Sequence, residues 1–310
     1  MHPATDWKPN RETWHLVPCP LCGGQRFEKL ATTDRYDMDL VTVGCVRCGL
    51  VMTNPQPDEQ SLDVFYRDHY RHYYQKTDAP SEAYIRELRK DERATTTARF
   101  LLDEGLVFHD AAVLDIGASE GCILKAIADL EPHTRRVAVE PNPLFGEFAV
   151  RHAGCTLYAS IEALRAAGLQ TFDLIIMNHV YEHVSHPVDF LTGLKALLTP
   201  RGQVYIDVPD ITEYERLDCL HIAHLFHFGP ATLALAAETA GFAVKRLDKH
   251  RPLMHPPSLR GVLQPATVTA QAPQQNLREG WDRVRQANRD AWRYHRRRWS
   301  LPRRLAHRWS

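Results

Sequence analysis

The chain has 310 residues, of which 44% are hydrophobic and 25% charged, and its formal net charge is zero. This composition is typical of a folded globular protein and excludes wholesale disorder or a continuous coiled coil. The sequence contains no run of eighteen apolar residues and does not start with a basic head before an apolar stretch. We therefore expect a cytoplasmic protein rather than a secreted or membrane-spanning one.

The neutral net charge conceals a strong asymmetry. Residues 278–310 hold eleven Arg and three acidic residues, a net charge of +8, so the remainder of the chain carries −8. The basic C-terminal end is therefore a separate feature of the chain.

Two Cys-x-x-Cys pairs stand out in the N-terminal segment. Cys19 and Cys22 form the first pair, and Cys45 and Cys48 form the second. Four thiolates in two tight loops suit the tetrahedral coordination that Zn²⁺ prefers, whereas seven cysteines in the whole chain are an odd number for a disulfide framework. We assign residues 1–56 to a zinc ribbon with these four ligands. Because four protein ligands leave no open coordination position, the zinc is predicted to be structural.

Residues 57–108 have a residue pattern typical of helices and are predicted to form an insert or lid. The N-terminal half of this segment is rich in tyrosine, at positions Tyr66, Tyr70, Tyr73 and Tyr74, and Ser81 is the expected N-cap of a helix in the other half. The tyrosines are expected either to line an acceptor pocket or to pack the ribbon onto the main domain. The sequence supports both interpretations equally.

From residue 109 to 268, strands and helices alternate, which predicts a parallel α/β sheet. The expected strands are residues 111–117, 135–140, 155–159, 172–178 and 202–209, followed by a helix at 231–242 and strands at 243–249 and 258–267. Helices are expected at about 120–130, 144–152, from 160, and at about 188–198.

The first strand of this region runs into a glycine-containing turn. Asp115 precedes Gly117 and Gly121, and glycine permits a sharp turn that lets a ligand approach the backbone at a helix N-terminus. Glu140 ends the next strand, where a carboxylate accepts hydrogen bonds from ribose hydroxyls. These features predict a nucleoside-containing cofactor.

The segment VLDIGASEG resembles motif I of class I methyltransferases, and FDLIIMNHVYEHV resembles their fourth-strand motif. The resemblance extends over residues 111 to about 250. It implies a Rossmann-like, seven-stranded methyltransferase fold that binds S-adenosylmethionine. By position, it implies that Asp115, Gly117, Ala118 and Gly121 surround the methionine part, Glu140 the ribose, Ser160 and Ile161 the adenine, and that Asn178 and His179 face the methyl end.

Methyl transfer to a hydroxyl or a carbon acid needs a base near the methyl group. Histidines follow the fourth strand at His179, His183 and His186, and the fifth at His221, His224 and His227. The order of CPLCGG, CVRCGLVMTNPQP, tyrosine-rich insert and VLDIGASEG resembles bacterial zinc-bearing methyltransferases of sugars, glycans and related metabolites. In these enzymes a segment like DCLHIAHLFHF carries a catalytic histidine, which implies His224 as the base.

Several alternatives stay open from the sequence. In the bacterial zinc-bearing methyltransferases a glutamate often precedes the catalytic histidine, and Ala223 replaces it here. This departure weakens the resemblance to C-methyltransferases, so O-methylation is expected as an alternative to C-methylation. A metal role for the histidines is a weaker alternative. An RNA methyltransferase and a non-catalytic interaction module are competing functions, although Met-Asn-His-Val after the fourth strand lacks the signature of enzymes that methylate base amines.

Residues 269–310 are predicted to be a linker and a basic amphipathic helix from about Asn276 to Trp299, which Pro302 ends. One stripe of this helix holds Trp281, Val284, Trp292, His295 and Trp299. The stripe is expected to pack on the methyltransferase domain or on a second subunit. The alternative is that it lies on an anionic membrane surface.

Overall fold

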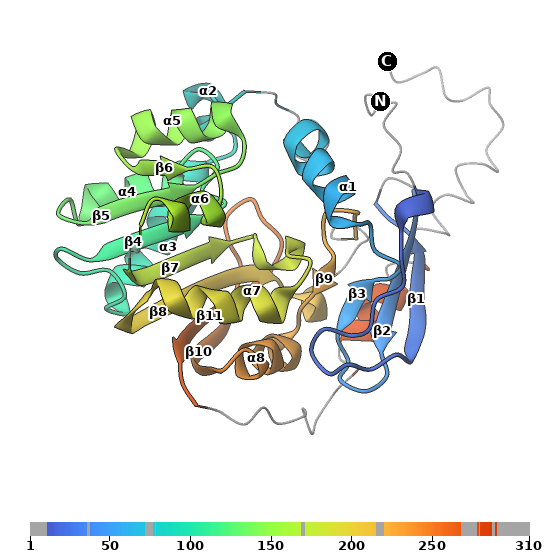
Figure 1. Cartoon of the computed structure of the whole chain (residues 1–310). Helices are drawn as coiled ribbons and strands as arrows, with labels where there is room; N and C mark the ends of the chain where they lie inside the picture. The colour runs from blue at the N-terminus through green and yellow to red at the C-terminus, as the bar shows by residue number, and fades with distance from the viewer. Residues whose placement is uncertain are drawn as a thin grey trace, which may run out of the picture.

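A computed structural model of the chain describes residues 11–35, 38–71, 77, 79–168, 171–214, 220–267, 278, 280–286 and 289. Within these residues, no helix has both the length and the apolar character needed to cross a membrane. The expectations for Tyr73, Tyr74, Trp292, His295, Trp299 and Pro302 lie outside the described residues. Figure 1 shows a large α/β body beside a small N-terminal β module.

The α/β body is built on a seven-stranded sheet with the order β10-β11-β8-β7-β4-β5-β6. The strands are β4 (Ala112–Ile116), β5 (Arg135–Val139), β6 (Thr156–Tyr158), β7 (Phe172–Asn178), β8 (Leu198–Pro209), β10 (Phe242–His250) and β11 (Ser258–Pro265). Strands β4 to β8 are parallel, as predicted. Strands β10 and β11 are antiparallel, so the sheet is mixed rather than wholly parallel. The connection at 251–257 is too short for the crossover that a parallel pair needs, so these strands form a hairpin.

Helices cover both faces of this sheet. One face carries α3 (Lys90–Asp103), α4 (Cys122–Leu130) and α5 (Pro143–Ala153), and the other carries α6 (Ile161–Ala166), α7 (Pro187–Leu194) and α8 (Pro230–Thr239). Successive strand residues alternate between the two cores: Val113 packs with α3 to α5, and Leu114 with α6 to α8. The architecture confirms the predicted Rossmann-like methyltransferase fold.

The order of the parallel strands reverses between β7 and β4. The chain moves from β4 outward to β5 and β6, then returns to β7 and moves outward in the other direction to β8. Ligands of open α/β sheets bind at the carboxyl ends of the strands beside such a switch point. The fold therefore places the ends of β4 and β7, and the loops that follow them, at a candidate site.

Short helices and 3-10 turns complete the fold. They are α1 (Glu59–Val64), η2 (Phe65–His69), α2 (Glu82–Glu87), and the 3-10 turns η1 (Arg11–Thr13), η4 (Tyr181–His183), η5 (Lys195–Leu197) and η6 (Ile211–Glu213). As predicted, Ser81 caps a helix: its side chain accepts a hydrogen bond from the backbone N–H of Tyr84.

The N-terminal module contains a second sheet with the order β1-β2-β3-β9. Strands β1 (Phe27–Thr33), β2 (Asp39–Cys45) and β3 (Val51–Thr53) come from the cysteine-rich segment, whereas β9 (Phe226–His227) follows β8 by sequence. Val51 pairs with His227 and Met52 with Phe226. The sheet of the module is thus completed from outside the predicted boundary at residue 56.

The start of the predicted C-terminal helix packs against this module. Trp281 and Val284 are buried in a cluster with Leu30, Val51 and Ile211. The indole Nε1 of Trp281 donates a hydrogen bond to the carbonyl oxygen of Gly49 at 2.9 Å. These two side chains lie inside the molecule, whereas Trp292, His295 and Trp299 of the same stripe lie outside the described residues. The partner of Trp281 and Val284 is mainly the cysteine-rich module rather than the methyltransferase sheet.

Candidate functional site

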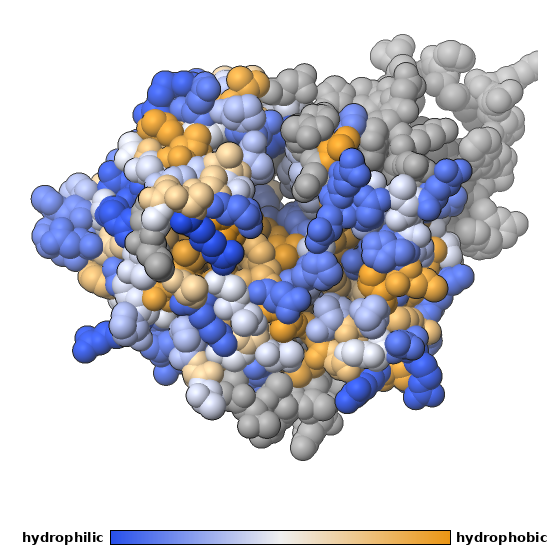
Figure 2. Space-filling view, viewed as in Figure 1, coloured by the Kyte–Doolittle hydropathy of each residue, from blue (hydrophilic) through white to orange (hydrophobic). Residues whose placement is uncertain are grey.

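A cavity of about 690 Å³ lies at the switch point of the seven-stranded sheet. Figure 2 shows a hollow with apolar side chains in the middle of the face that is turned to the viewer. Its walls include most of the predicted cofactor and catalytic residues, namely Asp115, Gly117, Ala118, Glu140, Ser160, Ile161, Asn178 and His179. Gly121 and His224 are absent from this lining.

The glycine turn after β4 approaches its neighbours too closely for any side chain. Gly117 has φ +72°, and a Cβ there would lie 2.7 Å from Cγ2 of Val180. Gly121 has φ +76°, and its Cβ would lie 2.9 Å from the Cβ of Ala149. The lack of a side chain at Gly117 therefore lets the turn approach Val180 at the cavity wall, whereas the lack of one at Gly121 lets α4 pack against α5.

Asp115 is buried under this turn, with 3% of its surface exposed. Burial, reinforced by the negative charge of Glu140, raises the pKa of Asp115 to about 8. The carboxyl group is therefore largely protonated at neutral pH and can donate a hydrogen bond into the cavity.

Glu140 receives donors on both carboxylate oxygens. Its Oε2 accepts the backbone N–H of Ser119 at 2.9 Å, and its Oε1 accepts that of Asn142 at 3.0 Å. Arg71 also donates to Oε1 at 2.9 Å and to the hydroxyl of Ser119 at 2.8 Å, with its guanidinium stacked on Phe145. Sequence reasoning missed Arg71, because nothing in its local sequence connects it with a strand end 69 residues later.

Ser160 and Ile161 lie where the third strand of the parallel set enters α6. The Ser160 side chain caps that helix by accepting the backbone N–H of Ala163 at 3.1 Å, and Ile161 is buried beside the cavity. Ser160 thus has a structural task as well as a place in the predicted adenine region.

His179 follows β7 directly and faces the cavity from a left-handed backbone conformation, φ +56°. Its Nδ1 lies 3.4 Å from a carboxylate oxygen of Glu182, and its Nε2 lies 3.9 Å from Asp207 and 3.1 Å from Nδ1 of His255. Burial opposes the charged imidazolium, but the interactions with Glu182 and Asp207 outweigh burial and raise the pKa of His179 above its ordinary value. A histidine at the cavity wall between two carboxylates is a candidate for proton transfer.

His224 lies behind His183 instead of in the cavity wall. The two rings meet edge to face with centroids 4.9 Å apart, and His183 does line the cavity. Burial, together with the neighbouring histidines, lowers the pKa of His224 well below its ordinary value. The sequence placed His224 at a strand end, but the packing of its segment against β3 removes it from the surface of the cavity.

Two of the four predicted tyrosines are described, and both line the cavity. Tyr66 donates its hydroxyl to the carbonyl oxygen of Ala223 at 2.9 Å, and its ring contacts Phe65, Tyr70 and His183. Tyr66 and Tyr70 therefore form a wall of the cavity and tie the insert to the segment before β9.

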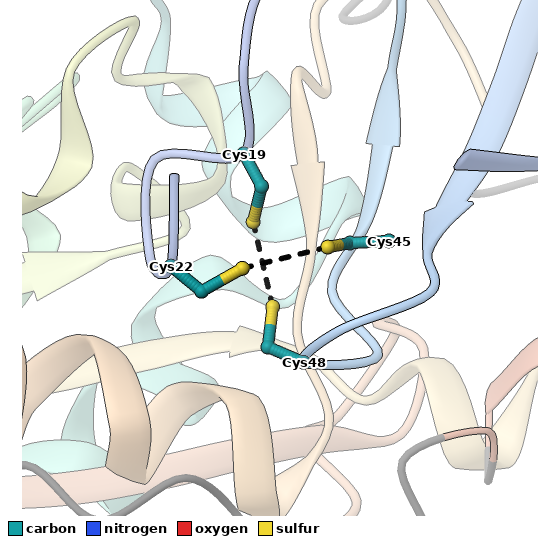
Figure 3. Close-up of side chains that lie close together, drawn as sticks. All are labelled: Cys19, Cys22, Cys45 and Cys48. Atoms are coloured by element: carbon teal, nitrogen blue, oxygen red, sulfur yellow. Dashed lines mark hydrogen bonds between the residues drawn. The ribbon is translucent and has the colours of Figure 1, made fainter. Parts of the chain in front are cut away.

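The four predicted zinc ligands converge at the edge of the N-terminal module (Figure 3). The Sγ atoms of Cys19 and Cys48 are 3.4 Å apart, and those of Cys22 and Cys45 are 3.5 Å apart. In Figure 3 the two lines that join these pairs cross, as opposite edges of a tetrahedron do. A tetrahedral site with Zn–S bonds of about 2.3 Å has S···S edges of about 3.8 Å, so the cluster fits Zn²⁺ with small adjustments.

A family model described as a methyltransferase domain matches residues 83–247, more than half of the chain. The chain belongs to this methyltransferase family. It is similar to a ubiquinone biosynthesis O-methyltransferase of Parvibaculum lavamentivorans, with 34% identity over 125 residues, which cover 37% of this chain and 47% of that protein. It is also similar to a release factor glutamine methyltransferase of Geobacter sulfurreducens, with 40% identity over 77 residues, 24% of this chain and 27% of the relative. The chain thus spans less than half the length of these curated relatives.

Among solved structures, the methyltransferase resembles the 1,6-didemethyltoxoflavin-N1-methyltransferase of Burkholderia thailandensis, which was solved with 1,6-didemethyltoxoflavin and S-adenosylhomocysteine bound. The TM-score is 0.51 at 21% sequence identity, over 70% of this chain and 96% of the other. This likeness shows that the class I fold is shared.

Proposed function

We propose that this methyltransferase transfers a methyl group from S-adenosylmethionine to a hydroxyl oxygen of a small, ring-shaped acceptor. The observation that carries the proposal is the arrangement within one cavity. The glycine turn and Glu140 lie beside the first two parallel strands, and His179 lies at the end of β7. The similarity to a ubiquinone biosynthesis O-methyltransferase supports oxygen as the atom that is methylated.

The residues around the glycine turn fit the proposed cofactor. When bound, S-adenosylmethionine supplies an electrophilic methyl group on a sulfonium. Glu140 is the acceptor for the ribose hydroxyls, which replace the hydrogen bond that Arg71 now makes to Oε1. Gly117 leaves room for the methionine part, Ile161 provides an apolar contact for the adenine, and Asn178 lines the same cavity at the end of β7.

His179 is the general base of the proposal. A hydroxyl acceptor must lose its proton as its oxygen attacks, and His179 is a cavity-lining histidine whose pKa is raised. Glu182 and Asp207 flank its two ring nitrogens and stabilise the imidazolium that forms. The role that the resemblance implied for His224 passes to His179, because His224 does not line the cavity.

The proposed acceptor class follows from the aromatic residues of the cavity wall. Tyr66 and Tyr70 line the cavity beside His183 and offer aromatic faces, which stack on a sugar ring or on a phenolic ring. Sugars and glycans were the expected acceptors, and catechols are the phenolic alternative for the same wall. Either acceptor presents a hydroxyl to a base at the end of β7.

The proposal includes a structural zinc bound by the four-cysteine cluster. All four ligands come from the chain itself, so the zinc holds the two Cys-x-x-Cys loops together and takes no part in methyl transfer. The closed ligand set distinguishes this role from catalysis.

The experiment measures S-adenosylhomocysteine released by the full-length protein with nucleotide sugars, free sugars and catechols as acceptors. The variant is His179→Ala, and the matched control is His186→Ala, an exposed histidine that also follows β7. We expect His179→Ala to lower kcat by about 10² to 10⁴-fold with cofactor affinity retained, and the control to match the wild type. Near-wild-type turnover of His179→Ala, or transfer only to RNA or to protein amides, contradicts the proposal.

A further inference from the structure

Glu182, in the turn after β7, carries a buried carboxylate that the methyl-transfer proposal uses only as a neighbour of His179. It is 1% exposed, and neither oxygen accepts a hydrogen bond from the described residues. Three imidazole nitrogens face its Oε1: Nδ1 of His179 at 3.4 Å, Nε2 of His224 at 3.8 Å and Nε2 of His183 at 3.9 Å. Burial of a carboxylate without donors is costly unless a positive charge compensates it.

The hydrogen bond on the other side of His183 fixes its tautomer. Its Nδ1 lies 2.7 Å from the carbonyl oxygen of Ala223. A carbonyl oxygen only accepts hydrogen bonds, so at this distance Nδ1 must carry the proton, and Tyr66 donates to the same oxygen. The neutral ring then presents the lone pair of Nε2 to Glu182. A lone pair that faces a carboxylate oxygen indicates that a cation belongs between them, and an imidazole that donates its other N–H to a backbone carbonyl is the usual arrangement of a metal ligand.

Two hydrogen bonds hold the segment of His224 beside the turn that carries Glu182 and His183. The N–H of Leu225 donates to the carbonyl oxygen of Glu182 at 3.0 Å, and the hydroxyl of Thr53 donates to that of His224 at 3.2 Å. One potential ligand atom from each of Glu182, His183 and His224 lies within 4.8 Å of the other two. Metal–nitrogen and metal–oxygen bonds of about 2.1 Å bring ligand atoms to roughly 3 to 3.5 Å from each other, so small side-chain movements close the set.

We propose that Glu182, His183 and His224 form a second metal site, separate from the four cysteines, for a divalent transition-metal cation. Two imidazoles and one carboxylate are suitable ligands for Zn²⁺, Fe²⁺, Co²⁺ or Mn²⁺. Ca²⁺ instead requires a site with more oxygen ligands. Three protein ligands leave coordination positions for water or an acceptor oxygen. Because His183 lines the cavity, these positions face the acceptor end. The role toward the acceptor rests on the proposed function, whereas the binding of the cation does not.

The test uses Co²⁺ on full-length protein that carries one equivalent of zinc per chain, bound at the cysteine site. Calorimetry counts the cobalt bound, and the visible spectrum identifies its ligands, because thiolates give intense charge-transfer bands that nitrogen and oxygen ligands do not. We expect one Co²⁺ per chain without thiolate bands. Glu182→Gln and His183→Ala should weaken binding by more than about 100-fold, since loss of an outer partner alone costs 10- to 100-fold. His186→Ala is the matched control and should bind like the wild type.

Binding of S-adenosylhomocysteine by each variant confirms that it is folded. The proposal is overturned if folded wild-type protein takes up no Co²⁺, if thiolate bands accompany the uptake, or if both site variants bind cobalt unchanged. Hydroxyl methylation by a protein that binds no Co²⁺ overturns the metal site and leaves the proposed function intact. Co²⁺ binding at this site without transfer to any hydroxyl acceptor supports the site and refutes the proposed function instead.

Discussion

The contact between Gly44 and Trp281 joins the cysteine-rich module to the C-terminal segment, and it allows a precise test. Gly44 lies in β2 directly beneath the indole ring. A Cβ at this position would lie 2.5 Å from Cζ2 and 2.6 Å from Nε1 of Trp281. The perturbation is Gly44→Ala, alone and combined with Trp281→Ala.

The structure gives the magnitude of each step. Trp281 is 1% exposed, so Trp281→Ala should lower the free energy of unfolding by about 3 to 5 kcal/mol. The backbone of Gly44 does not require glycine, since Gly44 is absent from the positive-φ residues, so the cost of Gly44→Ala is the steric conflict, about 1 to 3 kcal/mol. Without the indole, the methyl group has space, and alanine is favoured over glycine in a strand by about 0.5 to 1 kcal/mol.

The two substitutions should therefore be strongly non-additive. We expect Gly44→Ala to destabilise the wild type and to be stabilising in the Trp281→Ala background, with a coupling energy of about 1.5 to 4 kcal/mol. Urea denaturation of the four zinc-loaded proteins, followed by far-ultraviolet circular dichroism, measures this coupling. Additive effects within about 0.5 kcal/mol would refute the proposed contact.

Three further predictions concern the site and the metal. Glu140→Gln should weaken cofactor binding about 10- to 100-fold through the loss of charge-assisted hydrogen bonds, and unchanged affinity by calorimetry would remove the ribose assignment. For Asp115, the folded-state pKa of about 8 exceeds the ordinary value of 3.8, so the folded chain holds one more proton than the unfolded chain between these pH values. The contribution of Asp115 to the free energy of unfolding therefore falls as the pH rises from about 4 to about 8. Asp115→Asn should flatten that dependence in denaturation measured from pH 5 to 8, and parallel profiles would contradict it. Removal of the proposed zinc by a chelator should increase amide exchange in β3 and in β9 together, because the two strands pair. Increased exchange confined to β3 would count against the shared sheet.

Local sequence signals predicted the elements that depend on local physics. The run before Gly117 became β4, and the spacing of Cys19, Cys22, Cys45 and Cys48 indicated a four-thiol cluster, because such patterns act over a few residues. The glycine requirement at the turn was also visible, since side chains rarely adopt the left-handed conformation of Gly117.

Contacts between distant segments were not predictable in the same way. The hydrogen bond from Arg71 to Glu140, the pairing of β3 with β9, and the burial of Trp281 against Gly49 all depend on how finished elements pack. His224 illustrates the difference. Its position after a strand placed it near the cofactor, and the resemblance implied a catalytic role, but the packing of its segment against Thr53 leaves it behind the cavity wall.

Strand β9 also limits how this protein can be divided or recombined. The match to the methyltransferase family begins at residue 83, yet Phe226 and His227 within that span are an edge of the cysteine-rich module. An excised catalytic domain would expose this edge, and a chimera with a foreign ribbon would have to reproduce its register to keep the adjoining histidines in place. A new acceptor preference in such proteins should therefore arise by joint change of the ribbon and the loop before β9, and exchange of either part alone should produce insoluble or inactive hybrids.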